Sequence, residues 1–336
     1  MIIKLIRISY YANIFTTEIR GYTLKCMNFL ENISHLNNRQ TAITIGVFDG
    51  VHRGHQRLMQ DLLKEKNTDV TPIVITFANH PSEILRPTNS SQLITNTDTK
   101  IKLIKNLGIT EVIPIDFNKQ LADISALEFC NNIISALNPI GFVIGKDFSV
   151  GKGREGDVKF LQELGDNQNF WVRTIDDFTI NNEPVRSRLI RSKLLDGNII
   201  EANSLLGHSF EINGIVVHGN KRGRELGYPT ANMNIDPKTI TPADGIYSTT
   251  TSIHGEIYES VTSIGTRPTF GLKQRLIETY VMNYDGDLYG HDLNIHFFDK
   301  IRGQVQFNSI DELVSQIESD VEESRRITKS TVQDSE

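Results

Sequence analysis

The chain of 336 residues contains only two cysteines, Cys26 and Cys130, and they do not form a CxxC pair. So few cysteines argue against a disulfide framework or a cysteine-ligated zinc site, and they are typical of a reducing compartment. The sequence also lacks an unbroken run of about 18 apolar residues, the length that a transmembrane helix needs. We therefore expect a cytoplasmic protein with no membrane-spanning helix.

An excess of basic charge is missing as well. Lys and Arg number 35 against 41 Asp and Glu, which gives a net charge of −6. Proteins that bind a nucleic-acid backbone usually present a strongly basic face, so nucleic acid is not an expected partner. A local basic patch can still bind a small anionic ligand in a chain of this overall sign.

What the sequence has is enough length for two domains, at roughly 100–200 residues each. Residues 1–26 carry four basic side chains against one acid, and polar residues interrupt their apolar positions. We interpret this segment as an N-terminal extension outside the fold, with a targeting peptide as the alternative. Met27 opens the segment MNFLENISHL, where we place the start of the first domain.

The first domain, predicted over residues 27–186, alternates apolar β-branched runs with segments of helical spacing. Strands are expected at residues 42–48, 72–77, 111–117 and 141–145, with helices between them. This alternation predicts an α/β fold with a doubly wound parallel sheet covered on both faces. Ligands of such sheets bind at the carboxyl ends of the strands.

A helical connector is predicted over residues 187–206, with a break near Gly197. The pattern of predicted elements changes after it. Five short runs of strand character, separated by Gly, Pro, Asn or Asp, follow within residues 207–330. This pattern predicts a small antiparallel β-barrel. Ser309 and Glu312 form a capping-box pattern, which predicts a C-terminal helix packed on the barrel.

The stretch Gly46–His55, GVFDGVHRGH, follows the first predicted strand directly. Gly46 allows the backbone to approach a ligand closely. If His55 begins the next helix, both imidazoles and the N–H groups of that helix point to one anion-binding position. Such imidazoles can donate hydrogen bonds to a phosphate oxygen as charge builds up. The alternatives are that His52 and His55 only cap a helix, or that they belong to a metal site with no obvious third ligand.

A second cluster lies in residues 214–232, GIVVHGNKRGRELGYPTAN. Its glycines allow a tight loop, and Lys221, Arg222 and Arg224 give that loop positive charge, which suits a polyphosphate. Thr230 and Asn232 alternate along an extended segment and so share one face. Their neutral oxygens are suitable ligands for Mg²⁺, which usually keeps phosphate and water in its coordination shell. The alternative is a solvated basic hairpin tip.

The string GVFDGVHRGHQ resembles the first motif of the HxGH nucleotidyltransferases, in the form found in bifunctional riboflavin kinase/FMN adenylyltransferases. TFANHPSEIL, with His80 and Pro81, resembles that family's second motif, although Ala78-Asn79 stands where Glu-Pro is usual. Gly145–Asp157 resembles its flavin and nucleotide loop, with Val150 in place of the usual Phe. The resemblance implies catalytic roles for His52 and His55, nucleotide or phosphate contacts at Gly46, Phe48, Asp49, Gly54, Ser187 and Arg191, and flavin contacts at Asp147, Phe148 and Arg154.

One departure from the family lies at its phosphate site. The family normally has Ser-Ser-Thr shortly before Ile-Arg, whereas this chain reads Arg186-Ser187-Arg188-Leu189-Ile190-Arg191. Ser187 and Arg191 match the family pattern, and arginines occupy the two other hydroxyl positions. An arginine can bind phosphate, but it does not reproduce a small hydroxyl donor.

The loop and PTAN segment resemble the riboflavin kinase signature, and Ser263–Phe270 and Ile277–Thr279 continue the match. The resemblance implies that Glu278 is the kinase's catalytic base, that Gly219 and Arg224 contact the nucleotide, that Thr230 and Asn232 bind Mg²⁺, and that Arg302 contacts flavin. Without the motifs, a lone Glu in a strand pattern would be read as a solvent-facing residue. Tyr280 stands where His is common.

The resemblance covers about residues 27–327 and implies an enzyme that uses ATP twice. It would phosphorylate riboflavin to FMN, and then adenylylate FMN to FAD with release of pyrophosphate. Two alternatives remain open: a riboflavin kinase whose N-terminal domain is impaired in adenylyl transfer, and a non-catalytic flavin-binding regulator. The substitutions at Arg186 and Arg188 are the sequence feature that bears on the first alternative.

Overall fold

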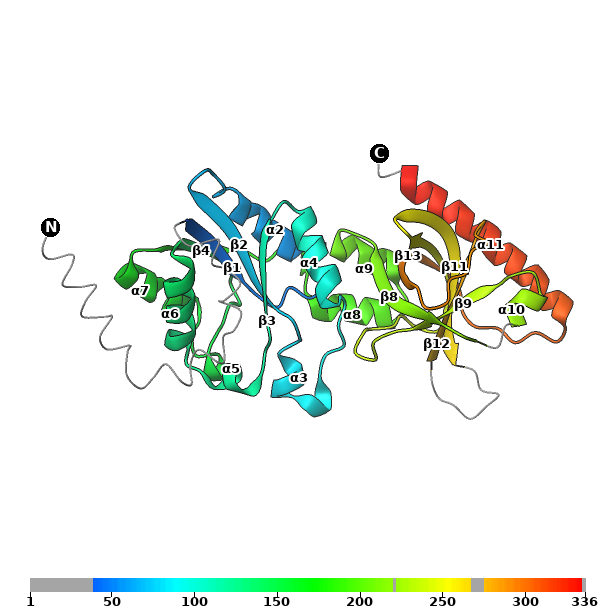
Figure 1. The fold of residues 1–336 in the computed structure, drawn as a ribbon, viewed down its shortest axis with the longest axis horizontal. Coiled ribbons are helices and arrows are strands. Elements are labelled where there is room, and N and C mark those ends of the chain that lie inside the picture. Colours follow the sequence, from blue (N-terminus) through cyan, green and yellow to red (C-terminus); the bar gives the residue numbers. More distant parts are fainter. Residues whose placement is uncertain (1–38, 220–221, 267–274, 334–336) are drawn as a thin grey trace, which may run out of the picture. The chain divides into compact units, whose positions relative to one another are not determined.

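The computed structural model describes residues 39–219, 222–266 and 275–333, so the prediction for residues 1–26 lies outside it. The described chain forms two compact units (Figure 1). The first contains residues 39–48, 56–91 and 101–177. The second contains residues 49–55 and 92–100 together with the chain from residue 178 onward. Two short segments of the N-terminal half thus pack with the C-terminal half.

The first unit is built on a five-stranded parallel sheet with the strand order β3-β2-β1-β4-β5. The strands are β1 (Gln40–Ile45), β2 (Val70–Phe77), β3 (Glu111–Ile115), β4 (Pro139–Gly145) and β5 (Trp171–Ile175). The first strand lies at the centre and the chain extends the sheet outward on both sides. Right-handed crossovers in opposite directions place helices on opposite faces. The predicted α/β fold is confirmed.

Several helices of the N-terminal half begin at a short polar side chain that caps them. They are α2 (Arg53–Leu63), α3 (Ser82–Leu85), α4 (Thr97–Asn106), α5 (Lys119–Asp123), α6 (Ala126–Leu137) and α7 (Val158–Gln168). Asn118, Ser125 and Asp157 each accept a hydrogen bond from a backbone N–H in the first turn of α5, α6 and α7. Such caps satisfy donors that a helix start leaves unpaired.

The sequence patterns did not predict β5. Its sequence, WVRTI, mixes apolar and polar residues, and it forms an edge strand with no fully buried side chain. Its first residue nevertheless fixes a neighbour, because a Cβ on Gly141 of β4 would lie 2.1 Å from the ring of Trp171. A glycine is required there for the indole to cover the sheet.

The second unit is a closed antiparallel barrel with the strand order β10-β11-β12-β9-β8-β13. Its strands are β8 (Phe210–Val217), β9 (Thr230–Asn234), β10 (Gly245–Ile253), β11 (Glu256–Thr266), β12 (Arg275–Val281) and β13 (Asp292–Arg302), and the short helix α10 (Arg222–Glu225) precedes β9. A two-stranded hairpin, β6 (Thr179–Ile180) and β7 (Glu183–Pro184), comes before them. The predicted barrel is confirmed, and its closure removes unpaired strand edges.

Three further helices belong to this second unit. The connector forms α8 (Ser187–Leu195) and α9 (Ile199–Leu206), broken at Gly197, where φ is +78°. Their apolar sides share one core with the barrel. The C-terminal helix α11 (Ile310–Gln333) packs on β10, β11 and β13, and the hydroxyl of Ser309 accepts from the N–H of Glu312. Among the described residues, no helix is long and apolar enough to cross a membrane.

Candidate active sites

The loop that follows β1 has a strained backbone. Phe48 and Val51 have positive φ angles of 50° and 39°, and Gly50 between them has a φ of 81°. Positive φ is uncommon outside glycine and is an outlier for a β-branched residue such as Val51. Strain of this kind persists only where surrounding contacts over-determine the conformation, and it occurs often at functional sites.

Asp49 supplies many of those contacts. Its buried carboxylate accepts from the backbone N–H groups of Ile94 and Thr95, both at 3.0 Å, and from the Arg191 guanidinium at 2.5 Å. Arg191 in turn donates to the carbonyl of Gln92 at 2.6 Å. The structure therefore gives Asp49 and Arg191 a role in holding this loop. Their contact with a nucleotide stays a prediction.

The N-terminus of α8 lies against the same loop. The hydroxyl of Ser187 donates to the carbonyl of Asp49 at 3.0 Å, and the carbonyl of Val185 would lie 3.5 Å from a Cβ on Gly54. Unpaired N–H groups at a helix start attract anions. Arg186 and Arg188 are both exposed on either side of Ser187, so they add positive charge next to this helix start.

His52 and His55 lie together as predicted from their spacing. Their rings stack with centroids 3.5 Å apart and planes 18° apart. The backbone N–H of His55 donates to Nδ1 of His52 at 3.4 Å. In the neutral His52 ring the proton is therefore on Nε2, which suits a donor to phosphate. Gly54 leaves room for this stack, since its Cβ would lie 3.1 Å from the His52 ring.

The pKa of His55 lies well below its usual value. Burial is the main cause, and the nearby charges of His52 and Lys100 lower it further. Lys100 is itself buried, which lowers its pKa to about 8 although Asp49 acts in the opposite direction. Desolvation disfavours the charged form of each base, so His55 is neutral near pH 7. The sequence did not single out Lys100 or Thr95, because neither lies in a recognisable motif.

The predicted flavin loop, Gly145–Asp157, belongs to the first unit. Asp147 and Arg154 are exposed and Phe148 is half-buried against the core of that unit. The Arg154 guanidinium donates to the Ser149 hydroxyl at 2.7 Å and approaches the carbonyl of Asp147 at 3.4 Å. These contacts bring Asp147 and Arg154 to the same part of the loop.

Two glycines of that loop pack on the start of α6. A Cβ on Gly151 would lie 2.3 Å from the backbone nitrogen of Ala126, and one on Gly156 would lie 2.4 Å from the Ala126 Cβ. The same nitrogen donates to the Glu155 carboxylate at 2.8 Å. The loop is therefore held against the first residue of α6 by packing and by a hydrogen bond.

In the second motif, Asn79 joins the ends of two strands. Its side chain donates to the carbonyl of Phe117 at 2.8 Å and accepts from the N–H of Phe117 at 2.7 Å. His80 contacts the Ser82 hydroxyl at 2.7 Å through Nδ1. Asn79 thus has a structural function at a position where the family usually has proline.

On the barrel, Thr230, Asn232 and Glu278 lie on one face of adjacent strands. Asn232 of β9 pairs directly with Glu278 of β12, and Thr230 pairs with Tyr280. The alternate residues of β9 and β12 point into the barrel and are buried, so the three site residues point outward. Directly opposed side chains in antiparallel strands are about 5 Å apart at Cβ. The structure therefore brings the predicted magnesium ligand Asn232 next to the predicted base.

Gly219 lies over Asn232. A Cβ at Gly219 would come 2.2 Å from Nδ2 of Asn232, so a glycine is required for the present side-chain position. In the loop that follows, the N–H of Tyr228 donates to the carbonyl of Gly223 at 2.8 Å, which fixes the chain just before Thr230. Lys221 and the side chain of Arg222 lie outside the described residues.

We predict that the riboflavin phosphorylation implied by the motifs falls about tenfold or more in Gly219→Ala. The new methyl group displaces the Asn232 side chain, and the loss of one contact of hydrogen-bond strength is worth about that factor. Conversion of FMN to FAD should not change. Gly303→Ala is the matched control, since its Cβ would meet no atom within 4 Å. Steady-state rates of both reactions for the two variants test this; equal rates of phosphorylation in both would contradict it.

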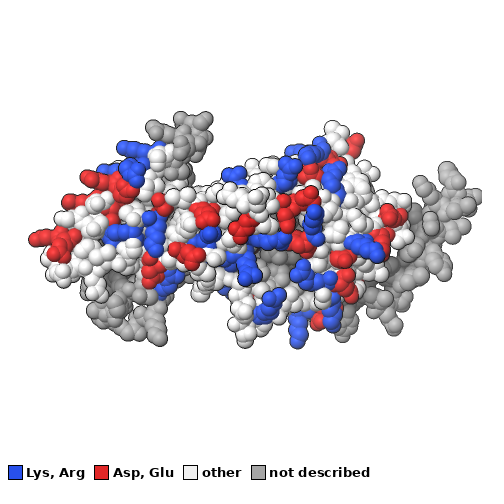
Figure 2. Space-filling model, turned by 180° about the vertical axis from the view of Figure 1, so that it is seen from behind, with Lys and Arg blue, Asp and Glu red and all other residues white. Residues whose placement is uncertain are grey.

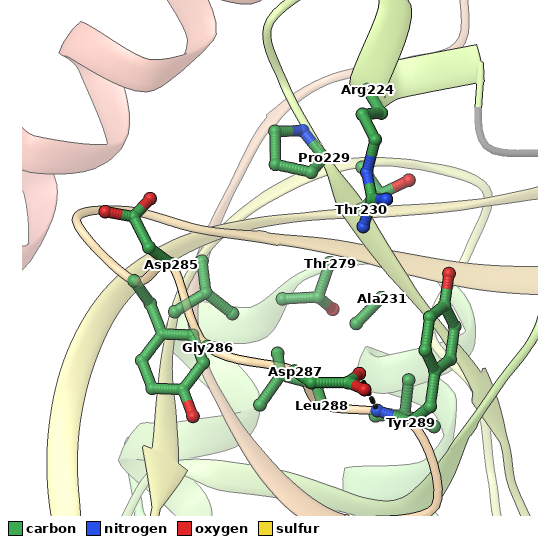
Figure 3. Close-up of a pocket in the computed structure, with 13 residues that line it drawn as sticks. Arg224, Pro229, Thr230, Ala231, Thr279, Asp285, Gly286, Asp287, Leu288 and Tyr289 are labelled. Atoms are coloured by element: carbon green, nitrogen blue, oxygen red, sulfur yellow. Dashed lines mark hydrogen bonds between the residues drawn. The ribbon is translucent and has the colours of Figure 1, made fainter.

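A cavity of about 530 Å³ opens at the end of the barrel next to Thr230. In Figure 3, Arg224, Pro229 and Thr230 lie above it, Asp285 lies at the left, and Asp287 and Tyr289 lie below and to the right. Apolar and aromatic side chains also line it, including Val216, Tyr284 and Leu288. The volume is within the range of small-ligand sites, and charged and hydroxyl-bearing side chains such as Arg224, Asp287 and Thr279 contribute to the lining.

Arg302 is anchored to the C-terminal helix. Its guanidinium donates to the carboxylate of Asp320 through Nε at 2.9 Å and through a terminal nitrogen at 2.7 Å, and Asp320 is buried. Such bidentate pairs fix geometry strongly. Arg302 therefore joins β13 to α11, and the flavin contact predicted for it is untested by this arrangement.

The surface charges agree with the composition. On the face drawn in Figure 2, the described Lys and Arg side chains are interspersed with Asp and Glu, without a broad area of one sign. A local basic group can still serve an anionic ligand, and Arg224 lines the barrel cavity.

Both halves of the chain match known protein families. Residues 34–189 match a family model described as FAD synthetase, and residues 206–328 match one described as riboflavin kinase. A bifunctional riboflavin kinase/FMN adenylyltransferase of Buchnera aphidicola (subspecies Schizaphis graminum) is 36% identical, over 89% of this chain and 97% of its own length. Proteins of the same name from Bacillus subtilis and Escherichia coli K12 are 35% and 34% identical, over 85% and 88% of this chain and 92% and 96% of their own lengths.

A crystal structure from Streptococcus pneumoniae, described as a macrolide-efflux protein, is also similar. It matches with a TM-score of 0.78 and 32% identity, over 85% of this chain and 94% of that one. The two matching family models and the relatives that align over nearly their whole length lead to one conclusion. The chain belongs to the family of bifunctional riboflavin kinase/FMN adenylyltransferases.

Proposed function

We propose that this chain performs both reactions of its family. Riboflavin phosphorylation takes place at the barrel, and FMN adenylylation takes place at the histidine loop, by which we mean residues 46–55 with His52 and His55. The observation that carries the kinase half is the direct pairing of Asn232 with Glu278 on one face of the barrel. The adenylyltransferase half is supported by the stacked pair His52 and His55 beside the start of α8.

In the kinase reaction, Glu278 accepts the proton of the ribityl 5′-hydroxyl as that oxygen attacks the γ-phosphorus of ATP. Phosphoryl transfer needs mainly positioning and charge stabilisation from a protein. Gly219 and Arg224 contact the nucleotide, and the cavity beside Thr230, which Arg224 also lines, accommodates it.

Thr230 and Asn232 would hold Mg²⁺ together with phosphate oxygens and water. Their donor set fits this ion, because Mg²⁺ prefers hard oxygen ligands and rarely has a site made of protein groups alone. Among the described residues, no group of three or more His, Cys, Asp or Glu side chains could hold a metal ion. When bound, the ion would neutralise charge on the transferring phosphate.

In the adenylyl transfer, a phosphate oxygen of FMN attacks the α-phosphorus of ATP and pyrophosphate leaves. His52 and the neutral His55 donate hydrogen bonds as charge builds on the α-phosphate. Ser187 and the N-terminus of α8 bind the departing phosphates, with Arg186 and Arg188 on either side. Asp147, Phe148 and Arg154 bind the flavin in this reaction.

One incubation with riboflavin, ATP and Mg²⁺, followed by chromatography of riboflavin, FMN and FAD, tests both halves. We expect FMN to form first and FAD to accumulate after it. Accumulation of FMN alone would instead support a kinase with an impaired N-terminal domain, and the arginines at 186 and 188 would be its cause. No consumption of ATP with riboflavin would support a non-catalytic flavin-binding protein.

A further inference from the structure

The strained loop at residues 48–51 is held by hydrogen bonds to its backbone from three other segments. The Asp49 carbonyl accepts from Ser187 at 3.0 Å, and the Gly50 N–H donates to the Thr95 hydroxyl at 3.0 Å. The third partner is His208, whose Nε2 lies 3.0 Å from the Gly50 carbonyl. Ser187 and Thr95 both contact Asp49 as well, through its carbonyl and its carboxylate. His208 contacts Gly50, and the mechanism proposed above gives it no role.

His208 lies between α9 and the barrel. It follows Gly207, which ends α9 with a φ of 78°, and comes two residues before β8 begins at Phe210. Its Nδ1 lies 2.9 Å from the carbonyl of Ser209. The half-buried ring therefore lies between Gly50 and the residue that precedes β8.

In both hydrogen bonds of His208 the ring must be the donor. A carbonyl oxygen only accepts hydrogen bonds, so each ring nitrogen must carry a proton to bind its partner. The imidazolium binds both carbonyls, and the neutral form with its proton on Nε2 binds Gly50 alone. The imidazolium and the neutral tautomer with its proton on Nε2 therefore both donate to the Gly50 carbonyl, two residues before His52, whereas the Nδ1-protonated tautomer does not.

We propose that His208 is a positioning residue for adenylyl transfer, which holds the Gly50 carbonyl and thereby sets where His52 and His55 present their donors. This inference rests on the proposed role of the two histidines. Three of the four loop residues, Phe48, Gly50 and Val51, have positive φ angles, and loss of one restraint allows the loop to relax. Donors that act in a transition state must be placed within a fraction of an ångström, and small misplacement is costly.

The effect should fall on the rate constant rather than on substrate affinity. Within the described chain, the hydrogen bonds of the His208 ring go to two backbone carbonyls, and the residues proposed to bind flavin lie in the first unit. We therefore expect His208→Ala to lower kcat for FAD formation about tenfold, the value of one lost hydrogen bond, with KM for FMN changed by less than about twofold.

The experiment measures both reactions on each full-length variant, because riboflavin phosphorylation on the same chain reports whether the barrel is intact. His208→Gln is the conservative variant, since its amide N–H can donate to Gly50, and it should recover most of the lost kcat. Thr95→Val removes the partner of the Gly50 N–H and should lower kcat for FAD formation in the same way, with phosphorylation unchanged.

The outcomes separate this inference from the proposed function. If the unaltered chain makes FMN but no FAD, the proposed adenylyl transfer fails, and the inference fails with it. If the unaltered chain makes FAD and His208→Ala keeps the full kcat, the inference alone is wrong. Equal loss of both reactions in His208→Ala, with no recovery in His208→Gln, would show a general structural role and would also overturn it.

Discussion

Replacing Glu278 with Gln should abolish most riboflavin phosphorylation and leave FMN adenylylation unchanged. General base catalysis contributes about 10²–10⁴-fold, so we expect the kcat of FMN formation to fall by that factor. The amide keeps the size of the side chain and its place opposite Asn232, but it cannot accept the proton of the 5′-hydroxyl. The barrel should therefore keep its fold and still bind riboflavin and ATP.

The matched control is Glu256→Gln, because Glu256 is exposed at the start of β11 and its carboxylate accepts a hydrogen bond from the hydroxyl of Tyr258. This control should phosphorylate riboflavin at the unaltered rate. FAD formation is measured separately by supplying FMN with ATP. A Glu278→Gln chain that loses both reactions equally would contradict separate sites, and one that keeps full phosphorylation would show that Glu278 is not the base.

Much of this arrangement follows from local sequence. The apolar, β-branched runs predicted β1 to β4, and alternation along β9 placed Thr230 and Asn232 on one face, as the structure has them. The stacking of His52 and His55 follows from their separation of three residues at a helix start. In each case the information lies within one turn or one strand, where periodicity determines which side chains meet.

The contacts that hold the histidine loop could not be predicted in this way. Asp49 binds Arg191 across 142 residues and Thr95 across 46, and no periodicity relates positions so far apart. The pattern of strands and helices likewise does not predict that residues 49–55 and 92–100 pack with the C-terminal half. Motif resemblance named Asp49 and Arg191, but it could not show that they bind each other. His208 and Lys100 have no local signal at all.

Replacing His55 with Asn should lower FAD formation about 10²–10³-fold, the usual effect of removing one preorganised donor to a developing negative charge. Asn keeps a polar group of similar reach but not the ring that stacks on His52 with centroids 3.5 Å apart. Riboflavin phosphorylation should be unchanged, since the barrel site is separate. FMN-dependent release of pyrophosphate measures the first rate and FMN production the second; equal FAD formation by both chains would exclude His55 from the reaction.

The same substitution should also change how stability depends on pH. Burial holds the pKa of His55 well below its unfolded value of about 6.5. Below about pH 6.5 the unfolded chain therefore binds a proton that the folded chain does not, and His55 makes the folded state less stable as the pH falls. Above that pH both states carry a neutral ring, and this contribution is absent. Because Asn does not titrate, the free energy of unfolding of His55→Asn should improve relative to the unaltered chain between pH 7 and pH 5. Urea titrations at both values measure this, and a constant difference would show that His55 is not held neutral by burial.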